Sequence, residues 1–296
     1  MSDSVLKASI LWHVVALLVI AIWGTTFVSS KVLLLNGMHP ADIFFYRFAL
    51  AYLCMCMLSH RRLFASSITD ELAFLGLGIF GGTMYFLAEN TALIYSTANN
   101  VAILVCTTPL VTAFVLAFFY RSERMTRRQV MWSLLAFVGM ALVVLNGQLV
   151  LHLNPLGDVL AFGASVAWAF YSLLMKRVMG HYSTDFITRK VFFYGILTIL
   201  PYYIFVHPLQ TDLYVLLKPV VLSNIAFLGL IASMGCYLLW NWVMAKLGAV
   251  KASNYLYLQT LFAMLAAALV LNEHISIMAL AGTFILLLGM YGLHKK

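Results

Sequence analysis

The sequence predicts an all-α, polytopic membrane protein with ten transmembrane helices arranged as two inverted five-helix repeats. Three observations lead to this fold class: an apolar composition, ten apolar segments of spanning length, and matching motifs in the two halves. Of the 296 residues, 64% are hydrophobic and 9% are charged, and the mean hydropathy is +0.97. A soluble domain of this length must build a large polar surface, whereas a chain that faces lipid has no such limit.

Ten segments of the chain satisfy the length and composition of a spanning helix, which needs about 20 predominantly apolar residues. Pro40, Pro155 and Pro219 stand near three of the predicted helix starts, where the missing N–H of proline removes no hydrogen bond. The predicted segments are 10–35, 40–58, 70–93, 97–119, 128–147, 156–178, 184–206, 220–245, 249–271 and 275–293.

Positive charges alternate between the predicted loops. With the N-terminus in the cytoplasm, the opposite side of the membrane holds only Lys218. Loop charge sets orientation, so this asymmetry predicts an even number of spans in a cell inner membrane, with both termini cytoplasmic. The predicted cytoplasmic set is Lys7, Arg61, Arg62, Arg121, Arg124, Arg127, Arg128, Lys176, Arg177, Lys246, Lys251, Lys295 and Lys296.

Several functional classes are disfavoured by what the sequence does not contain. The net charge of +8 does not indicate nucleic-acid binding, because the chain has no basic stripe and no long soluble segment. The four cysteines lie in apolar segments without a Cys-x-x-Cys pair, so we expect no disulfide and no metal site. No catalytic or phosphate-loop motif is found. We therefore expect neither an enzyme nor a cofactor, and any pumping must use a gradient or exchange.

The two halves of the chain, residues 1–147 and 156–296, share motifs in the same order. Trp23 in the first half matches Trp168 in the second. Because each half carries five predicted spans, an odd number, the second half enters the membrane from the opposite face. Further matched pairs are Lys31 with Lys176, Asp42 with Asp185, Arg47 with Lys190, Asn90 with Asn241, Glu123 with Glu273, and Gly139 with Gly289.

A set of short motifs adds a family resemblance. These motifs are Trp23-Gly24-Thr25-Thr26-Phe27, Arg47-Phe48, Thr107-Thr108-Pro109-Leu110, Ala245-Lys246-Leu247-Gly248-Ala249 and Leu271-Asn272-Glu273. In them the chain resembles the drug/metabolite transporter superfamily, in its EamA branch, over nearly its whole length. The resemblance implies ten helices, two EamA repeats, and export or exchange of amino acids and other small metabolites. The chain departs from the family at Thr260, where the second half usually has a proline.

Ionisable groups inside a membrane are costly and are functional candidates by default. Glu89 is the carboxylate that lies well inside a predicted span. It is either a proton-titrating or cation-binding group that faces a cavity, or a rim carboxylate that reaches water or pairs with Arg47. Arg47 and Lys190 either have a functional role or only position their helices, by snorkelling to the nearest interface or by bridging to a neighbouring carbonyl or acid.

Trp23 and Trp168 lie near the middle of their segments, whereas interfacial tryptophan is expected at the ends. An indole N–H in the core prefers a partner, so the pair either lines a cavity or packs helices together. Thr26 and Tyr171 follow about one turn later on the same faces. Further candidates at similar depth are Asn90, Thr107, Thr108, Asn241, Tyr257 and Gln259.

We expect these residues, with Glu89, to line a central cavity between spans one, three, four, six, eight and nine. Aromatic walls with few charges suit a small neutral or zwitterionic solute. The leading expectation is a secondary transporter that works by alternating access, with a small-molecule substrate, the lipid bilayer as its surroundings and proton coupling as one option. Two alternatives stay open: an intramembrane enzyme, which would need converging carboxylates or histidines, and a non-transporting receptor or subunit.

Overall fold

The computed structural model describes residues 3–59, 63–96, 101, 104–145, 154–271 and 275–294. Within these ranges the regular secondary structure is helical, apart from an isolated bridge between Met179 and Tyr182. The all-α class is therefore confirmed for the described chain. Several predictions rest on residues outside these ranges, namely Arg61, Arg62, Asn272, Glu273, Lys295, Lys296 and the first residues of the fourth predicted span.

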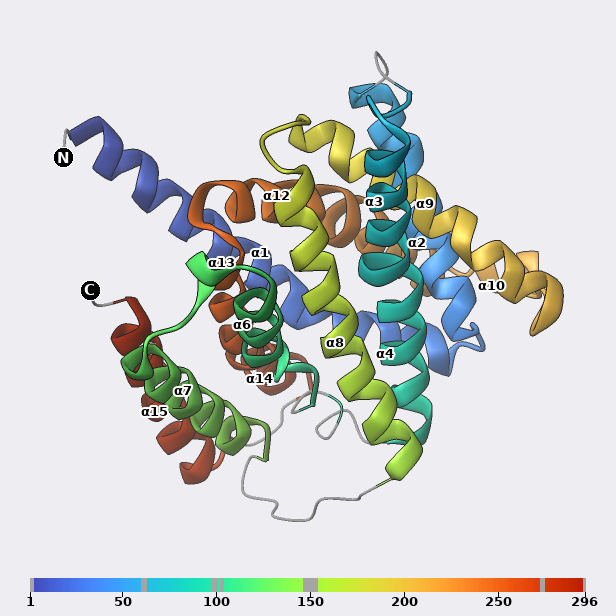
Figure 1. The fold of residues 1–296 in the computed structure, drawn as a ribbon. Helices are drawn as coiled ribbons and strands as arrows, with labels where there is room; N and C mark the ends of the chain where they lie inside the picture. The colour runs from blue at the N-terminus through green and yellow to red at the C-terminus, as the bar shows by residue number, and fades with distance from the viewer. Residues whose placement is uncertain are drawn as a thin grey trace.

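The first half begins with two long helices and continues with interrupted ones (Figure 1). A π-helical stretch, η1, joins α3 to α4 within one continuous helix. The elements are α1 (Asp3–Leu35), α2 (Pro40–Leu58), α3 (Ile68–Gly78), η1 (Ile79–Thr83), α4 (Met84–Tyr95), α6 (Thr108–Phe119), the 3-10 turn η2 (Arg121–Glu123) and α7 (Arg127–Leu145).

The second half follows the same plan. A π-helical stretch, η3, joins α11 to α12, and the 3-10 turn η4 separates α13 from α14. The elements are α8 (Pro155–Val178), α9 (Thr184–Phe205), α10 (Leu213–Leu216), α11 (Pro219–Ala226), η3 (Phe227–Gly235), α12 (Cys236–Leu247), α13 (Ala249–Asn254), η4 (Tyr255–Leu258), α14 (Gln259–Leu271) and α15 (Ile277–His294).

Six helices in the described ranges are long and apolar enough to cross a membrane. They are Ile10–Leu35, Pro40–Leu58, Ile68–Tyr95, Arg127–Leu145, Pro155–Val178 and Pro219–Leu247, and shorter apolar helices cover Thr108–Phe119 and Ile277–Leu293. Large apolar side chains such as Phe114, Phe118 and Phe205 are exposed on the outside of the bundle. Such a surface is typical of a protein that lipid surrounds.

Equivalent helices of the two halves are interrupted at equivalent places. The π-helical stretches η1 and η3 both lie in the third long helix of their half. In the fourth, Pro109 stands in the first turn of α6, where its ring is tolerated, directly after a turn at residues 106–107. Its counterpart is interrupted by the 3-10 turn η4. Such irregular turns are frequent at functional sites.

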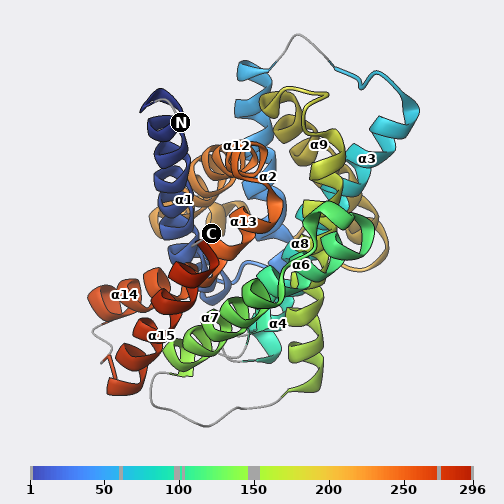
Figure 2. The same ribbon diagram turned by 60° about the vertical axis from the view of Figure 1, so that its left-hand side comes forward.

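Contacts between the halves occur in reciprocal pairs. Helix α1 packs against α12 and α14, while its counterpart α8 packs against α4 and α6. Helix α2 contacts η3, and its counterpart α9 contacts η1. The last helix of each half, α7 and α15, pack on each other and lie side by side in both views (Figures 1 and 2). Exchanging the halves therefore exchanges each of these contacts for its counterpart.

Candidate functional site

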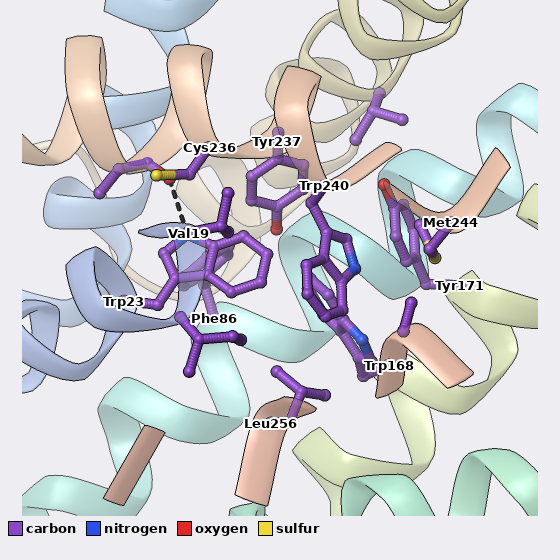
Figure 3. Packing of buried hydrophobic residues seen from close by; sticks show 14 of the residues in the cluster. Val19, Trp23, Phe86, Trp168, Tyr171, Cys236, Tyr237, Trp240, Met244 and Leu256 are labelled. Atoms are coloured by element: carbon purple, nitrogen blue, oxygen red, sulfur yellow. Dashed lines mark hydrogen bonds between the residues drawn. The ribbon is translucent and has the colours of Figure 1, made fainter. Parts of the chain in front are cut away.

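Aromatic side chains from three helices meet at the centre of the bundle (Figure 3). Trp23 on α1 packs edge to face against Trp168 on α8, with ring centroids 5.5 Å apart. Tyr237 on α12 lies 5.9 Å from the first ring and 6.0 Å from the second, and Trp240 lies 5.2 Å from Trp23. The Trp23 indole N–H donates to the carbonyl of Ala232 at 2.9 Å, drawn as the dashed line. This cluster joins the two halves.

A cavity with about 520 Å³ of empty space is walled by this cluster and its neighbours. This volume includes open space at the mouth of the cavity. Six of the predicted candidates line it, namely Trp23, Thr26, Glu89, Thr108, Trp168 and Gln259. They come from five helices, α1, α4, α6, α8 and α14.

The start of α14 is held against α1 beside this cavity. Gln259, the first residue of α14, donates its side-chain N–H to the carbonyl of Trp23 at 3.3 Å. Thr260 donates to the carbonyl of Tyr257, within its own turn, at 2.9 Å. The Thr260 hydroxyl therefore bonds the backbone of the 3-10 turn.

Five predicted candidates, Asn90, Thr107, Tyr171, Asn241 and Tyr257, are placed away from the cavity wall. The Tyr171 hydroxyl donates to the Asn241 carbonyl oxygen at 2.6 Å, and the Asn241 amide donates to the Thr188 hydroxyl at 2.9 Å. This chain of bonds connects α8, α12 and α9, so these polar groups hold helices together. Such interhelical bonds satisfy side chains that the bilayer cannot solvate.

The other three have similar structural partners. Asn90 donates to the carbonyl of Pro40 at 3.3 Å and so ties α4 to the start of α2. The hydroxyls of Tyr257 and Ser133 lie 3.0 Å apart and join η4 to α7. Thr107 bonds the carbonyl of Leu104 at 2.6 Å, in the turn that precedes α6.

Seven further residues complete the cavity wall and were not predicted to do so: Arg47, Tyr85, Phe86, Val105, Cys106, Tyr237 and Leu256. Arg47 belongs to α2, which the expected set of lining spans omitted. Helical spacing could have identified Tyr85 and Phe86, because residues three or four positions before Glu89 share its face. The Tyr237 position could not have been found this way, because it depends on how α12 packs across the other half.

Arg47 does not snorkel to an interface. Its side chain is buried, and its guanidinium carbon lies 4.3 Å from the centre of the Phe86 ring. Its Nε donates to the Ser233 hydroxyl, on η3 in the second half, at 2.9 Å. The sequence analysis considered a bridge from Arg47 to a neighbouring carbonyl or acid, but the structure shows a bridge to a hydroxyl.

Glu89 is a buried residue of the cavity wall rather than an exposed rim carboxylate. Its side-chain oxygen Oε1 accepts a hydrogen bond from the Tyr85 hydroxyl at 3.1 Å. In the part of the chain that the structure describes, the ion pairs within 4.0 Å join Lys176 to Glu123 and Lys190 to Glu71. The proposed pairing of Glu89 with Arg47 is therefore not formed at ion-pair distance.

Comparison with known proteins places this architecture in a family. The profile of the EamA-like transporter family matches twice, at residues 10–145 and 155–294. The chain is 27% identical to an uncharacterized transporter of Archaeoglobus fulgidus, covering 94% of this chain and 96% of that protein. It is 26% identical to a probable amino-acid metabolite efflux pump of Salmonella typhimurium, covering 93% and 92% of the two chains.

Two further similarities extend over almost the whole chain. A probable amino-acid metabolite efflux pump of Escherichia coli is 24% identical, with 94% of this chain and 93% of that protein covered. One crystal structure superposes with a TM-score of 0.73 at 16% identity, covering 96% of this chain and 97% of the other, which supports the fold. The chain belongs to the EamA-like transporter family of the drug/metabolite transporter type, as a multi-pass membrane protein with two copies of the family's repeat.

Proposed function

We propose that the chain exports or exchanges amino acids or similar small metabolites through the central cavity by alternating access. The observation that carries this proposal is a cavity walled by both halves, beside the interrupted helices α6 and η4–α14. Substrate sites of secondary transporters lie at such repeat interfaces, next to discontinuous helices. Two relatives named as probable amino-acid metabolite efflux pumps support the substrate class.

The proposed architecture has ten membrane-spanning segments, five in residues 1–147 and five in residues 156–296. The reciprocal contacts between the halves support a twofold relation. An odd number of crossings in each half would put the twofold axis in the membrane plane and make the repeats inverted. Rocking of one half against the other would then open the cavity alternately to each side. Both termini would lie on the cytoplasmic side of a cell inner membrane.

Two energy sources for transport are compatible with this site: a proton gradient and exchange of solutes. Coupling to protons would use Glu89, the carboxylate of the cavity wall. Exchange of one solute for another would need no titrating group. Counterflow measured with and without a proton gradient distinguishes these two cycles.

The test is transport of labelled neutral amino acids by purified protein in vesicles. Trp168→Ala, Gln259→Ala and Glu89→Gln should each lower the rate at least tenfold, because each removes a group from the cavity wall. The matched control is Trp242→Ala, since Trp242 lies on the outer surface, paired edge to face with Trp12 at 6.2 Å. Wild-type rates for all three cavity variants, at equal amounts of folded protein, would place the transport site elsewhere.

A further inference from the structure

A buried cation and a buried carboxylate face the same cavity without pairing with each other. Arg47 is 3% exposed and Glu89 is 7% exposed, and both line the cavity. No ion pair of 4.0 Å or less joins them in the described residues. Leaving opposite charges apart in a poorly solvated site is costly, and proteins ordinarily pair such groups. The separation therefore needs a physical explanation.

The guanidinium of Arg47 is fixed on one side and open on the other. Its Nε is occupied by the Ser233 hydroxyl, and one face lies against the Phe86 ring. A guanidinium carries five N–H donors, four of them on its two terminal nitrogens. Within the described chain, neither terminal nitrogen has a protein hydrogen-bond partner. The edge formed by these two nitrogens matches the two oxygens of a carboxylate, which arginine binds in a bidentate manner.

The carboxylate of Glu89 is held in a similar one-sided way. The Tyr85 hydroxyl donates to Oε1, and Oε2 has no donor among the residues that the structure describes. A carboxylate can accept about four hydrogen bonds, so most of its capacity remains for a ligand. A ligand ammonium can supply both the hydrogen bonds and the opposite charge.

Two other buried cations, both on α9, have oxygen partners at their terminal nitrogens. Lys190, on α9, forms an ion pair with Glu71. Arg189, the next buried arginine along the chain, donates to the backbone carbonyl of Ser59. Arg47 differs from Lys190 in that it forms no ion pair within the described residues, although Glu89 lines the same cavity. Its open edge is therefore a local feature of the cavity.

We infer that the cavity binds a zwitterionic α-amino acid, with the carboxylate on Arg47 and the ammonium at Glu89. The inference rests on the proposed transport function and specifies how its substrate is held. A ligand with both charges close together compensates both protein charges at once, which a neutral, cationic or anionic solute cannot do. Trp23, Trp168 and Phe86, in the same wall, would contact an apolar side chain of the ligand.

The first test uses wild-type protein and therefore does not depend on any variant folding. Calorimetric titration compares L-phenylalanine with L-phenylalaninamide, which lacks the carboxylate, and with 3-phenylpropanoate, which lacks the ammonium. L-leucine, leucinamide and 4-methylpentanoate form a second series. We expect each one-charge analogue to bind at least tenfold more weakly than its parent amino acid. If the amide or the acid binds as tightly as the parent in both series, or no amino acid binds, the inference is wrong.

The second test assigns each charge to its residue. Arg47→Gln should lower the affinity for the amino acid at least tenfold and leave the affinity for its amide within about twofold. Glu89→Gln should do the converse, weakening the amino acid but not the carboxylate analogue. Arg47→Lys keeps the positive charge and should recover part of the loss. Arg189→Gln is the matched control, because Arg189 bonds a carbonyl away from the cavity wall.

The variants also separate this inference from the proposed function. Transport of any solute that depends on Trp168 but not on Arg47 or Glu89 would refute the zwitterion site and leave the cavity as the transport route. Transport that is insensitive to all of the cavity residues would refute both. A uniform loss of affinity for parent and analogues in Arg47→Gln would show that Arg47 only holds α2 against η3.

Discussion

Trp23 and Trp168 meet edge to face with their ring planes at 89°, and they occupy matching positions in the two halves of the chain. Their indole N–H groups nevertheless differ in hydrogen bonding. The Trp23 N–H is bonded to the carbonyl of Ala232, whereas the buried Trp168 N–H has no hydrogen-bond partner in the described residues. The Trp23 N–H thus bonds α1 to η3, whereas Trp168 contributes its ring to the cavity wall and has a buried N–H that is not bonded within the described chain.

This difference predicts unequal effects of the same substitution. Trp23→Phe and Trp168→Phe remove the same volume, but only the first removes a buried hydrogen bond, which contributes about 1 kcal/mol. We expect Trp23→Phe to lower the thermal unfolding midpoint more than Trp168→Phe, in detergent-solubilised protein. Trp168→Phe should lower solute affinity, because its ring lines the cavity. Equal midpoints for both variants would contradict this assignment.

The sequence predicts most helix ends closely, because they depend on local signals. The second span is expected at 40–58, and α2 covers Pro40–Leu58, with its proline in the first turn. The ninth span is expected as one helix over 249–271, but the chain forms α13, the 3-10 turn η4 and α14. No local residue pattern marks this interruption, since it depends on packing against helices of the first half.

Part of the cavity wall could also be predicted from the sequence, because some of its residues are marked by local signals. Trp23 and Trp168 were identified by their depth in the spans, and Glu89 by the cost of a carboxylate there. Arg47 was named as an ionisable residue in a span but not as a cavity residue, because the position of its side chain depends on Ser233, which lies in the other half of the chain. The depth of a residue in its predicted span therefore identifies polar residues inside the membrane. It does not distinguish a residue that lines the cavity, such as Gln259, from one that only bonds helices together, such as Asn241.

Lys190 and Glu71 form a buried ion pair between α9 and α3. Removing one partner of a buried pair leaves an uncompensated charge and costs roughly 3–5 kcal/mol, and partial exposure of Glu71 places this case at the lower end. We expect Glu71→Gln to lower the unfolding midpoint clearly. The double variant Glu71→Gln with Lys190→Met should recover most of the loss. Equal midpoints for the single and double variants would mean that the charge is not the cause.

Loop charges predict the orientation of the protein in the membrane. The 207–218 loop holds Lys218, and both termini are expected on the other side, in the cytoplasm. Reporter fusions at the C-terminus and within 207–218 should therefore report opposite compartments. Reports from one compartment at both positions would overturn the ten-span arrangement.

The imidazoles of His39 and His207 stack at 4.0 Å beside the ends of α2 and α9, outside the spanning segments. Burial lowers the pKa of His39 below 6.5, the neighbouring His207 lowers it further, and Asp42 opposes the shift. Because the folded state favours the neutral ring, the unfolded state binds more protons as pH falls below 6.5. Stability from this group is therefore present above pH 6.5 and lost as pH falls towards the folded pKa.

The measurement is the unfolding midpoint between pH 8 and pH 5, which should decrease more in wild type than in His39→Asn. Asparagine keeps the acceptor that now bonds the Ala41 N–H at the start of α2, at 3.3 Å, but it cannot titrate. His181→Asn, at an exposed position, serves as the control and should keep the wild-type pH dependence. The same pH dependence in His39→Asn would exclude the stacked pair as its source.

Helices α7 and α15 approach closely because glycines lie at their contact. A Cβ atom added to Gly139 would lie 2.7 Å from the Leu286 Cα, and backbone atoms cannot move aside as a flexible side chain can. Small residues at such interfaces let helices associate through packing in lipid, where no hydrophobic force drives them together. Gly139→Ala should therefore separate the two helices and cost about 1–3 kcal/mol of stability.

Gly163→Ala, on α8, is the matched control, since its added Cβ meets no atom within 4 Å. It should change stability by no more than about 1 kcal/mol, in the favourable direction that helix propensity gives alanine. Thermal unfolding of both variants in the same detergent makes the comparison, and an equal midpoint for the two would show that the α7–α15 contact tolerates a wider spacing.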